Sequence, residues 1–460
     1  MRVWQLTGLN SFLEISFHEL ALFAGIGIFL GSMAEISLDI VALTVWFLLR
    51  RAVRQPKKAV SPQPLIDQGP FAVFVPAWRE ADVIGQMLDA AMVSYEGDDV
   101  HLFVGCYPND PDTVSIVRSR EGPKVTLVLV DRDGGTTKAH CLNNAYRALL
   151  AFEIASGRLF SGIVLHDAED LISPREIAVF RENSVRFAMI QLPVCPLPKP
   201  DSRWISGHYC DEFAEAHGKT MIARQFIGAA LPSAGVGCMF RRDAIAALAA
   251  RNGGEPFSED SLTEDYELGL RLGELGFTSA FIVEADSSAP GFVCTQAYFP
   301  HELASAVKQK ARWMAGIGLD GWSRLGWGRG WAEIWMRARD RRGLSSAVIL
   351  LAAYLALVIA ILLWLLQGLS GRPLFVPHGF LSLLLWTNGA LALWRLSMRF
   401  LCTYRYYGHG EAFRSVPRVL VSNAIGILAS MEAVRLHLSS LRTGHVRWEK
   451  TMHVFPKSKE

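Results

Sequence analysis

Three acids stand in the run from His166 to Asp170, directly after the apolar stretch 161–165. An apolar stretch that ends in a polar break is typical of a buried strand, so these acids are expected at the C-terminal end of a strand. In open α/β sheets that edge is where ligands bind. Two carboxylates spaced like Asp167 and Glu169 can hold one hard divalent cation, and the cation can bridge a diphosphate. A solvated acidic turn is the plainer alternative.

Acids also follow three other apolar stretches that we expect to be strands. Each acid alone is a common turn former. In one sheet, however, four strand ends that carry acids would converge on one cleft. The three are Glu80 after 71–75, Asp110 after 101–105, and Asp131 with Asp133 after 125–130.

The loop 133–138 contains Gly134 and Gly135 and ends in Lys138. Its glycines allow close backbone approach, the helix start that follows offers free N–H groups, and the lysine adds charge. A phosphate-bearing ligand would suit this loop, although its spacing is not that of a Walker A motif. The alternative is an ordinary glycine turn with a helix cap.

Two further segments carry polar groups that could serve a cleft. Ser261 and Glu264 have the spacing of a capping box at a helix start, while the neighbouring Asp265 could point into the site as a base for a sugar hydroxyl. Downstream, the segment 303–314 has Leu303, Val307, Ala311 and Met314 on one helical face, which indicates an amphipathic interfacial helix.

Composition limits the function classes. The 460 residues are 51% hydrophobic, which is high for a soluble protein. The net charge of +2, without a basic cluster interleaved with aromatics, argues against a nucleic-acid partner. The seven cysteines are odd in number and contain no Cys-x-x-Cys pair, which favours reduced thiols over disulfides or a zinc site.

The apolar residues are concentrated in a few long runs. The run 20–49 is interrupted only by Glu35 and Asp39, and we expect one long spanning helix there. Charges are costly in lipid, so these two acids, four residues apart on one helical face, should face protein or the interface. The runs 347–366 and 380–394 predict a helical pair joined by a short outer loop.

Basic residues set the expected orientation. A basic flank within 50–58 follows the first span, and Arg337, Arg339, Arg341 and Arg342 precede the second. The positive-inside rule therefore places residues of about 51–342 in the cytoplasm. The segment 416–433 is apolar enough to cross but has arginines on both sides, so an interfacial or re-entrant helix and a fourth span are equally open.

Between the membrane segments, the expected strands alternate with helical patterns such as 139–154 and 174–185. This alternation predicts βαβ units and a largely parallel α/β sheet. We expect an N-terminal spanning helix with its basic flank (1–58), a cytoplasmic domain with interfacial helices (59–342), C-terminal transmembrane or interfacial helices (343–440) and a basic tail (441–460).

Together these motifs resemble processive family 2 glycosyltransferases, the membrane synthases of cellulose, chitin, hyaluronan and poly-N-acetylglucosamine. The resemblance rests on Asp110, Asp167-x-Glu169, Thr263-Glu264-Asp265 and Gln309-x-x-Arg312-Trp313, in order and at similar spacing over about residues 65–330. Within this family, the sequences of residues 166–170, 257–266 and 448–456 most resemble the bacteriophage adsorption protein B branch.

The resemblance implies a GT-A fold, a nucleotide-sugar donor and inverting transfer in one displacement. It implies that the donor nucleoside is held by Glu80 and Asp110, with Lys138 near the nucleotide, and that Mg²⁺ or Mn²⁺ is held by Asp167 and Glu169. Asp265 would be the general base beside Glu264, and the diphosphate and acceptor would be held by Gln309, Arg312 and Trp313. One departure is Glu169, where the family usually has Asp, so Asp170 is a second candidate for this metal-binding role.

The resulting hypothesis is a multi-pass enzyme of the bacterial inner membrane that uses a UDP-sugar to make a surface polysaccharide. In one form of the hypothesis the enzyme also exports this product. Its partners would be the donor, a growing glycan or lipid-linked acceptor, the bilayer, and outer-membrane or periplasmic export proteins. Two alternatives stay open: transfer of a single sugar to a lipid carrier, and a non-catalytic phage-receptor or assembly protein.

Overall fold

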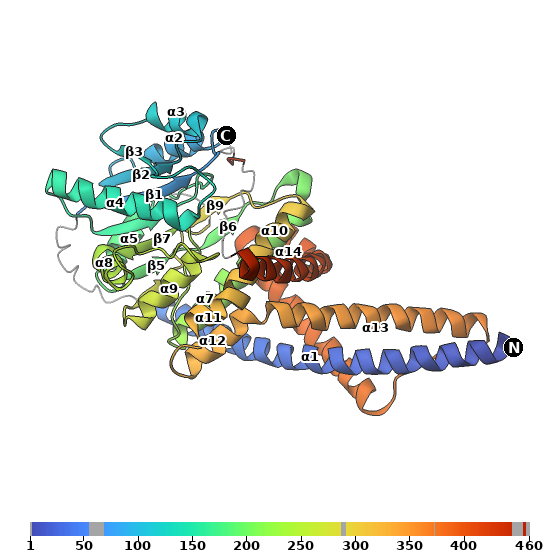
Figure 1. The fold of residues 1–460 in the computed structure, drawn as a ribbon. Coiled ribbons are helices and arrows are strands. Elements are labelled where there is room, and N and C mark those ends of the chain that lie inside the picture. The colour runs from blue at the N-terminus through green and yellow to red at the C-terminus, as the bar shows by residue number, and fades with distance from the viewer. Residues whose placement is uncertain (1, 55–68, 287–290, 372, 444–453, 457–460) are drawn as a thin grey trace.

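The computed structural model describes residues 2–54, 69–286, 291–371, 373–443 and 454–456. It places an α/β domain on one side and long helices extending away from it (Figure 1). The seven-stranded sheet has the order β3-β2-β1-β4-β7-β5-β8, and β6 and β9 form a separate parallel pair. The strands are β1 (Phe71–Ala77), β2 (Val100–Cys106), β3 (Val125–Leu129), β4 (Gly162–Leu165), β5 (Met189–Gln191), β6 (Val194–Pro196), β7 (Cys238–Arg241), β8 (Ser279–Phe281) and β9 (Thr295–Ala297).

The sheet is mixed but largely parallel, as the alternation of strands and helices predicts. Strands β3, β2, β1 and β4 are parallel to one another, and β5 is parallel to β8. Strand β7 runs antiparallel to both β4 and β5. Because Cys238 pairs with Leu165, β7 begins where β4 ends. The loop before β7 therefore lies at the same sheet edge as the acids that follow β4.

Side chains of each strand alternate between two apolar layers. Phe71, Val73 and Val75 pack into one core, whereas Ala72 and Phe74 pack into the other. This is the two-residue period of a strand buried on both faces. The first core is covered by α2 (Ile84–Ser94), α3 (Pro111–Arg118) and α5 (Glu176–Ser184), and the second by α4 (Lys138–Ser156), α8 (Arg242–Arg251) and α9 (Glu264–Glu274).

A second group of helices lies between the sheet and the long helices (Figure 1). Two of its members are π-helical turns that extend an α-helix, η2 after α6 and η3 after α10. The group comprises the 3-10 turn η1 (Pro200–Ser202), α6 (Ile205–Glu215), η2 (Ala216–Thr220), α7 (Met221–Phe226), α10 (Leu303–Met314), η3 (Ala315–Asp320), α11 (Gly321–Leu325) and α12 (Trp331–Arg341).

Within the described ranges, three helices have the length and apolar composition needed to cross a membrane: α1 (Arg2–Arg54), α13 (Gly343–Leu369) and α14 (Gly379–Thr443). The prediction of one long N-terminal helix and a later helical pair is confirmed. Helix α14 is much longer than the predicted run 380–394, and a non-helical Gly408 divides it. The side chains of the basic flank 50–58 and the tail residues 444–453 and 457–460 lie outside the described residues.

The two acids of α1 are buried in protein, as predicted for charges at membrane depth. Glu35 and Asp39 are 2% and 0% exposed. Lys219 Nζ donates to Asp39 Oδ1 at 2.7 Å, and Trp394 Nε1 donates to Asp39 Oδ2 at 3.0 Å. Glu35 pairs with arginines of α12 and of the turn that follows it, namely Arg339 and Arg342. The acids thus join α1 to the domain and to α14.

Candidate active site

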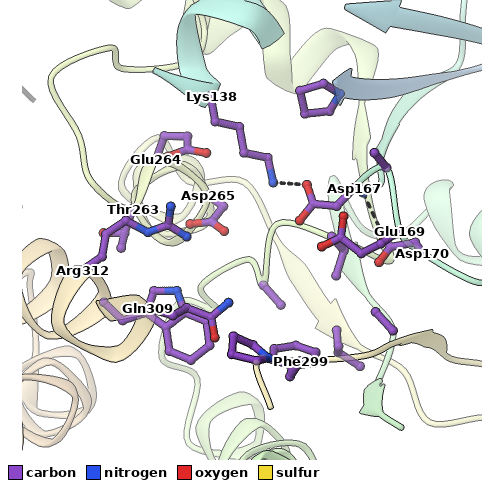
Figure 2. A pocket seen from close by; sticks show the side chains of 18 of the residues that line it. Lys138, Asp167, Glu169, Asp170, Thr263, Glu264, Asp265, Phe299, Gln309 and Arg312 are labelled. Carbon is purple, nitrogen blue, oxygen red and sulfur yellow. Dashed lines mark hydrogen bonds and ion pairs between the residues drawn. The ribbon is translucent and has the colours of Figure 1, made fainter. Parts of the chain in front are cut away.

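One cavity gathers side chains from the ends of β1 and β4, the starts of α4 and α9, and helix α10 (Figure 2). All of the predicted site residues except Asp110 line it. They are Glu80, Lys138, Asp167, Glu169, Glu264, Asp265, Gln309, Arg312 and Trp313.

The acidic turn after β4 is held from behind by a buried histidine. Asp170 is 3% exposed, and its Oδ2 accepts from the backbone N–H of Asp167 at 2.9 Å and from His166 Nδ1 at 3.0 Å. His166 Nε2 also donates to Glu176 Oε1 at 2.9 Å. Burial alone would lower the pKa of His166, but Glu176 and Asp170 together raise it to about 10. Asp170 therefore shapes the turn through Oδ2. It also lines the cavity, so that a share in metal binding stays a prediction for this residue.

Lys138 forms the cationic centre of the cavity. Its Nζ donates to Asp167 Oδ1 at 2.5 Å, as Figure 2 shows. Burial opposes its charge, but Asp167, Glu264 and Asp265 outweigh burial and raise the pKa of Lys138. The lysine begins α4, whose N-cap Thr137 accepts from the backbone N–H of His140 at 3.2 Å. The predicted glycine loop thus presents a fixed ammonium between two sets of carboxylates.

Glu264 and Asp265 open α9, so their backbone is fixed by the helix start. Asp265 Oδ1 accepts from the backbone N–H of Tyr266 at 2.7 Å. Burial raises the pKa of Asp265, and burial together with the Asp265 charge raises the pKa of Glu264 to about 7. A carboxylate with a raised pKa is a stronger base whenever it is ionised.

The predicted capping box is wrong. The N-cap of α9 is Thr263, and Ser261 Oγ accepts from the backbone N–H of Thr263 at 3.3 Å instead of capping the helix. Glu264 is consequently the first helical residue, two positions earlier than the box requires. Its side chain lines the cavity together with that of Asp265.

Gly235, in the loop before β7, packs against the Asp265 carboxylate. A Cβ on this glycine would overlap Asp265 Oδ2. Its φ of 78° is also one that residues with side chains rarely adopt. Only glycine leaves the carboxylate room at this position.

Helix α10 supplies polar atoms that lack protein partners. In the part of the chain that the structure describes, Gln309 Oε1 and Arg312 Nε are buried and have no hydrogen-bond partner. Buried polar atoms are nearly always paired, so such exceptions often mark a place where a ligand binds. Trp313 of the same helix packs with Tyr209 and Phe213 of α6. The predicted amphipathic helix is therefore packed against protein, although Leu303 of its expected apolar face is 45% exposed.

The acids that follow β1, β2 and β3 have different surroundings. Glu80 is 5% exposed and lines the cavity. Asp110 caps α3 through the backbone N–H of Thr113 and also accepts from the backbone N–H of Arg79, so it braces the turn that carries Glu80. Asp131 lies 2.7 Å from His140 Nε2 and is not part of the cavity lining. The expected convergence of four acidic strand ends thus holds for β1 and β4 only.

Several lining residues were missed from the sequence. Phe213 comes from α6, Tyr298 and Phe299 follow β9, and Ala234 and Val236 precede β7. None belongs to a motif with recognisable spacing. The pairing of β7 with β4 and of β6 with β9 brings the segments beside β7 and β9 to the cavity.

Asp167 and Glu169 fit a divalent cation such as Mg²⁺ or Mn²⁺. They come from one turn and line one cavity, and Asp167 already attracts the Lys138 ammonium. In the described ranges, no group of three or more His, Cys, Asp or Glu side chains could hold a metal ion by itself. A cation here would complete its coordination shell with phosphate oxygens and water, as Mg²⁺ commonly does.

Sequence comparison identifies the domain. The family model described as "Glycosyltransferase like family 2" matches residues 68–316, a little over half of the chain. The chain belongs to this glycosyltransferase family. The family 2 assignment confirms the resemblance inferred from the motifs.

Two curated relatives of this family 2 glycosyltransferase are bacteriophage adsorption protein B of Escherichia coli strain K12 and bacteriophage N4 adsorption protein B of Escherichia coli O157:H7. Each is 37% identical over 413 residues, which cover 85% of this chain and 55% of the relative. The chain therefore spans about half the length of these relatives.

Among solved structures, a mannosyltransferase from Pyrobaculum calidifontis in complex with GDP-Man and Mn²⁺ has a similar fold. The TM-score is 0.52 at 18% identity, covering 90% of this chain and 99% of the mannosyltransferase. At this identity the likeness shows the fold alone. The predicted GT-A fold with flanking apolar helices is confirmed.

Proposed function

We propose that this family 2 glycosyltransferase is an inverting enzyme of the bacterial inner membrane, with residues 59–342 in the cytoplasm. It would use a UDP-sugar to extend a surface polysaccharide. One observation carries the proposal. Gln309 Oε1 and Arg312 Nε, which are buried and have no hydrogen-bond partner, belong to residues that line the same cavity as several carboxylates and the Lys138 ammonium. A ligand with an anionic diphosphate and neutral hydroxyls matches that set of charges.

On the donor side, Lys138 and Arg312 present fixed positive charge to the diphosphate, and Glu80 is assigned to the nucleoside. Asp110 acts through the turn that it braces. Mg²⁺ or Mn²⁺, held by Asp167 and Glu169, would supply charge neutralisation for the departing diphosphate. When transfer occurs, the bond between sugar C1 and the diphosphate oxygen breaks, and the nucleoside diphosphate keeps the electron pair.

On the acceptor side, Asp265 takes the proton of the attacking hydroxyl while the new bond to C1 forms. Its carboxylate is held by the start of α9, and burial keeps it more basic than a solvated aspartate. Trp313 and Phe299 offer aromatic faces near the acceptor end of the cavity. Attack from the side opposite the diphosphate inverts the configuration at C1.

In the direct test, the purified full chain in membranes is incubated with Mn²⁺ and a panel of UDP-sugars and GDP-sugars, and the released nucleotide is measured. Release of UDP from one donor, lost in Asp265→Asn, is the expected result. Release of nucleotide from no donor would favour the assembly role suggested by the names of the relatives. Product length separates the remaining alternative, since transfer to a lipid carrier adds one sugar and polymerisation adds many.

A further inference from the structure

Helix α14 consists of two parts with different surroundings. Gly408, with φ 76° and ψ −172°, separates residues 379–407 from residues 409–443. The first part packs along α1, where Asn388 Nδ2 donates to the Gly25 carbonyl oxygen at 2.8 Å. We call residues 409–443 the surface helix. It contains the segment 416–433, which sequence analysis left open between a span and an interfacial helix.

One face of the surface helix is buried against the catalytic domain. Arg418 is 0% exposed and donates to Asp211 Oδ1 of α6 at 2.8 Å. It also donates to Glu411 Oε2 of the surface helix itself at 2.7 Å. Further along, Ala429 and Ala433 pack on α10 and η3. The surface helix therefore braces the helix that carries Gln309, Arg312 and Trp313.

The opposite face of the surface helix is exposed and carries four large apolar side chains, with Arg435 (71% exposed) between the last two. The side chains on it are spaced by seven, eleven and seven residues, which places them on one side of an α-helix. A surface of this kind, opposite a face that is buried in protein, needs an apolar neighbour. The side chains are Phe413 (68% exposed), Leu420 (60%), Met431 (65%) and Leu438 (51%).

The chain beyond the surface helix returns to the catalytic domain. Phe455 packs against the sheet core that α2, α3 and α5 cover. A surface helix that crossed the membrane would put Phe455 on the side away from that core. The contact of Phe455 thus argues against a fourth crossing.

The direction of the surface helix also argues against a fourth crossing. In Figure 1 the dark red ribbon of the surface helix is strongly foreshortened, whereas α1 and α13 extend across the page. The surface helix therefore runs across the direction of these two apolar helices. Because it continues from the first part of α14, it leaves the proposed bilayer at its kink.

We propose that the surface helix lies flat on the membrane leaflet nearest the catalytic domain, with its apolar stripe in the boundary between lipid headgroups and acyl chains. Amphipathic helices bind membranes in this way, at a depth of about 5–10 Å. The partner of this surface is a phospholipid bilayer. The contacts of the surface helix with α10 then hold the acceptor end of the cavity close to the membrane. The inference rests on the proposed membrane embedding and is independent of the proposed chemistry.

Spin labels test the depth of the stripe. Single cysteines would replace Leu420, Met431 and Leu438 in the full chain, reconstituted in vesicles of phosphatidylcholine and phosphatidylglycerol. The seven native cysteines are all buried and should resist labelling. Power saturation compares access to oxygen, which concentrates among acyl chains, with access to a water-soluble nickel complex. Two controls are Leu383→Cys on the first part of α14, 66% exposed, and Ile154→Cys on α4, 85% exposed.

The expected result is one shallow, oxygen-accessible depth shared by the three labels, with Leu383→Cys deeper and Ile154→Cys open to nickel. A depth that changes steadily along the three positions would show a crossing and overturn the proposal. Nickel access equal to that of Ile154→Cys, or shielding from both reagents, would overturn it in favour of water or a protein partner. If Leu383→Cys also lies in water, the membrane embedding itself fails, which is a separate failure of the proposed function.

Discussion

Replacing Gly235 with alanine should displace the proposed base without altering its chemistry. The new Cβ would overlap the Asp265 carboxylate, which must move to make room. Gly228 offers a matched control, because it has the same φ of 78° and no atom within 4 Å of the position where a Cβ would lie. Alanine at either site bears the same backbone strain, and only Gly235→Ala reaches the active site.

The magnitudes follow from these two environments. Left-handed backbone costs a residue with a side chain roughly 1–2 kcal/mol, so both variants should lose about that much stability. Displacement of a reacting group by about 1 Å costs on the order of 10²-fold in rate. Gly235→Ala should therefore lose about 10²-fold in kcat while Gly228→Ala stays within a few-fold of the parent.

The assay is UDP release at saturating donor, with thermal unfolding measured on the same preparations. Equal losses of turnover in the two variants would assign the effect to backbone strain. Parent-like turnover in Gly235→Ala, despite a folded protein, would refute the view that the position of Asp265 limits transfer.

Three further outcomes are expected. Asp167→Asn should abolish Mn²⁺-dependent turnover, while Asp131→Asn, at a strand end outside the cavity, should retain it; full activity in EDTA would contradict metal assistance. Because burial raises the pKa of Asp265, acid should protonate the base and stop transfer at a pH above the ordinary aspartate value of 3.8. A kcat profile that declines only below 3.8 would contradict this assignment. A cysteine at Ile154, exposed on α4, should resist a membrane-impermeant thiol reagent in intact cells, and ready labelling would reverse the proposed orientation.

The parallel half of the fold was predictable because its strands are short apolar runs that end in acids or turns. Strand β7 was not, since its antiparallel direction depends on pairing with β4 and β5 far away in the sequence. That direction brings Gly235 to Asp265. No local pattern indicates such a contact.

The site was predictable to the extent that strand ends and helix starts fix side-chain positions. Lys138, Asp167 and Asp265 line one cavity for this reason. Asp110 and Asp131 also follow strands, but nearby groups engage them: backbone N–H groups bind Asp110, and His140 contacts Asp131. Spacing along a single sequence cannot determine which of these partners a carboxylate takes.

Apolarity alone could not decide the place of the segment 416–433. Lipid and a protein interior both favour the same residues, so a run of suitable length fits either. The deciding feature is Arg418, whose buried ion pair with Asp211 of α6 requires protein on that face. The kink at Gly408 then separates this helix from the part of α14 that packs along α1.

The central claim is that Asp265 is the base in transfer from a nucleotide-sugar. Calorimetric UDP affinity measured beside turnover in Asp265→Asn tests it most directly, because metal and donor are assigned to other residues. Asparagine keeps the oxygen that accepts from the Tyr266 N–H. The control Glu267→Gln loses an acid from the first turn of the same helix, outside the cavity. We predict a loss of roughly 10²-fold or more in turnover, with nearly unchanged UDP affinity, for Asp265→Asn alone. Parent-like turnover in Asp265→Asn would contradict the account.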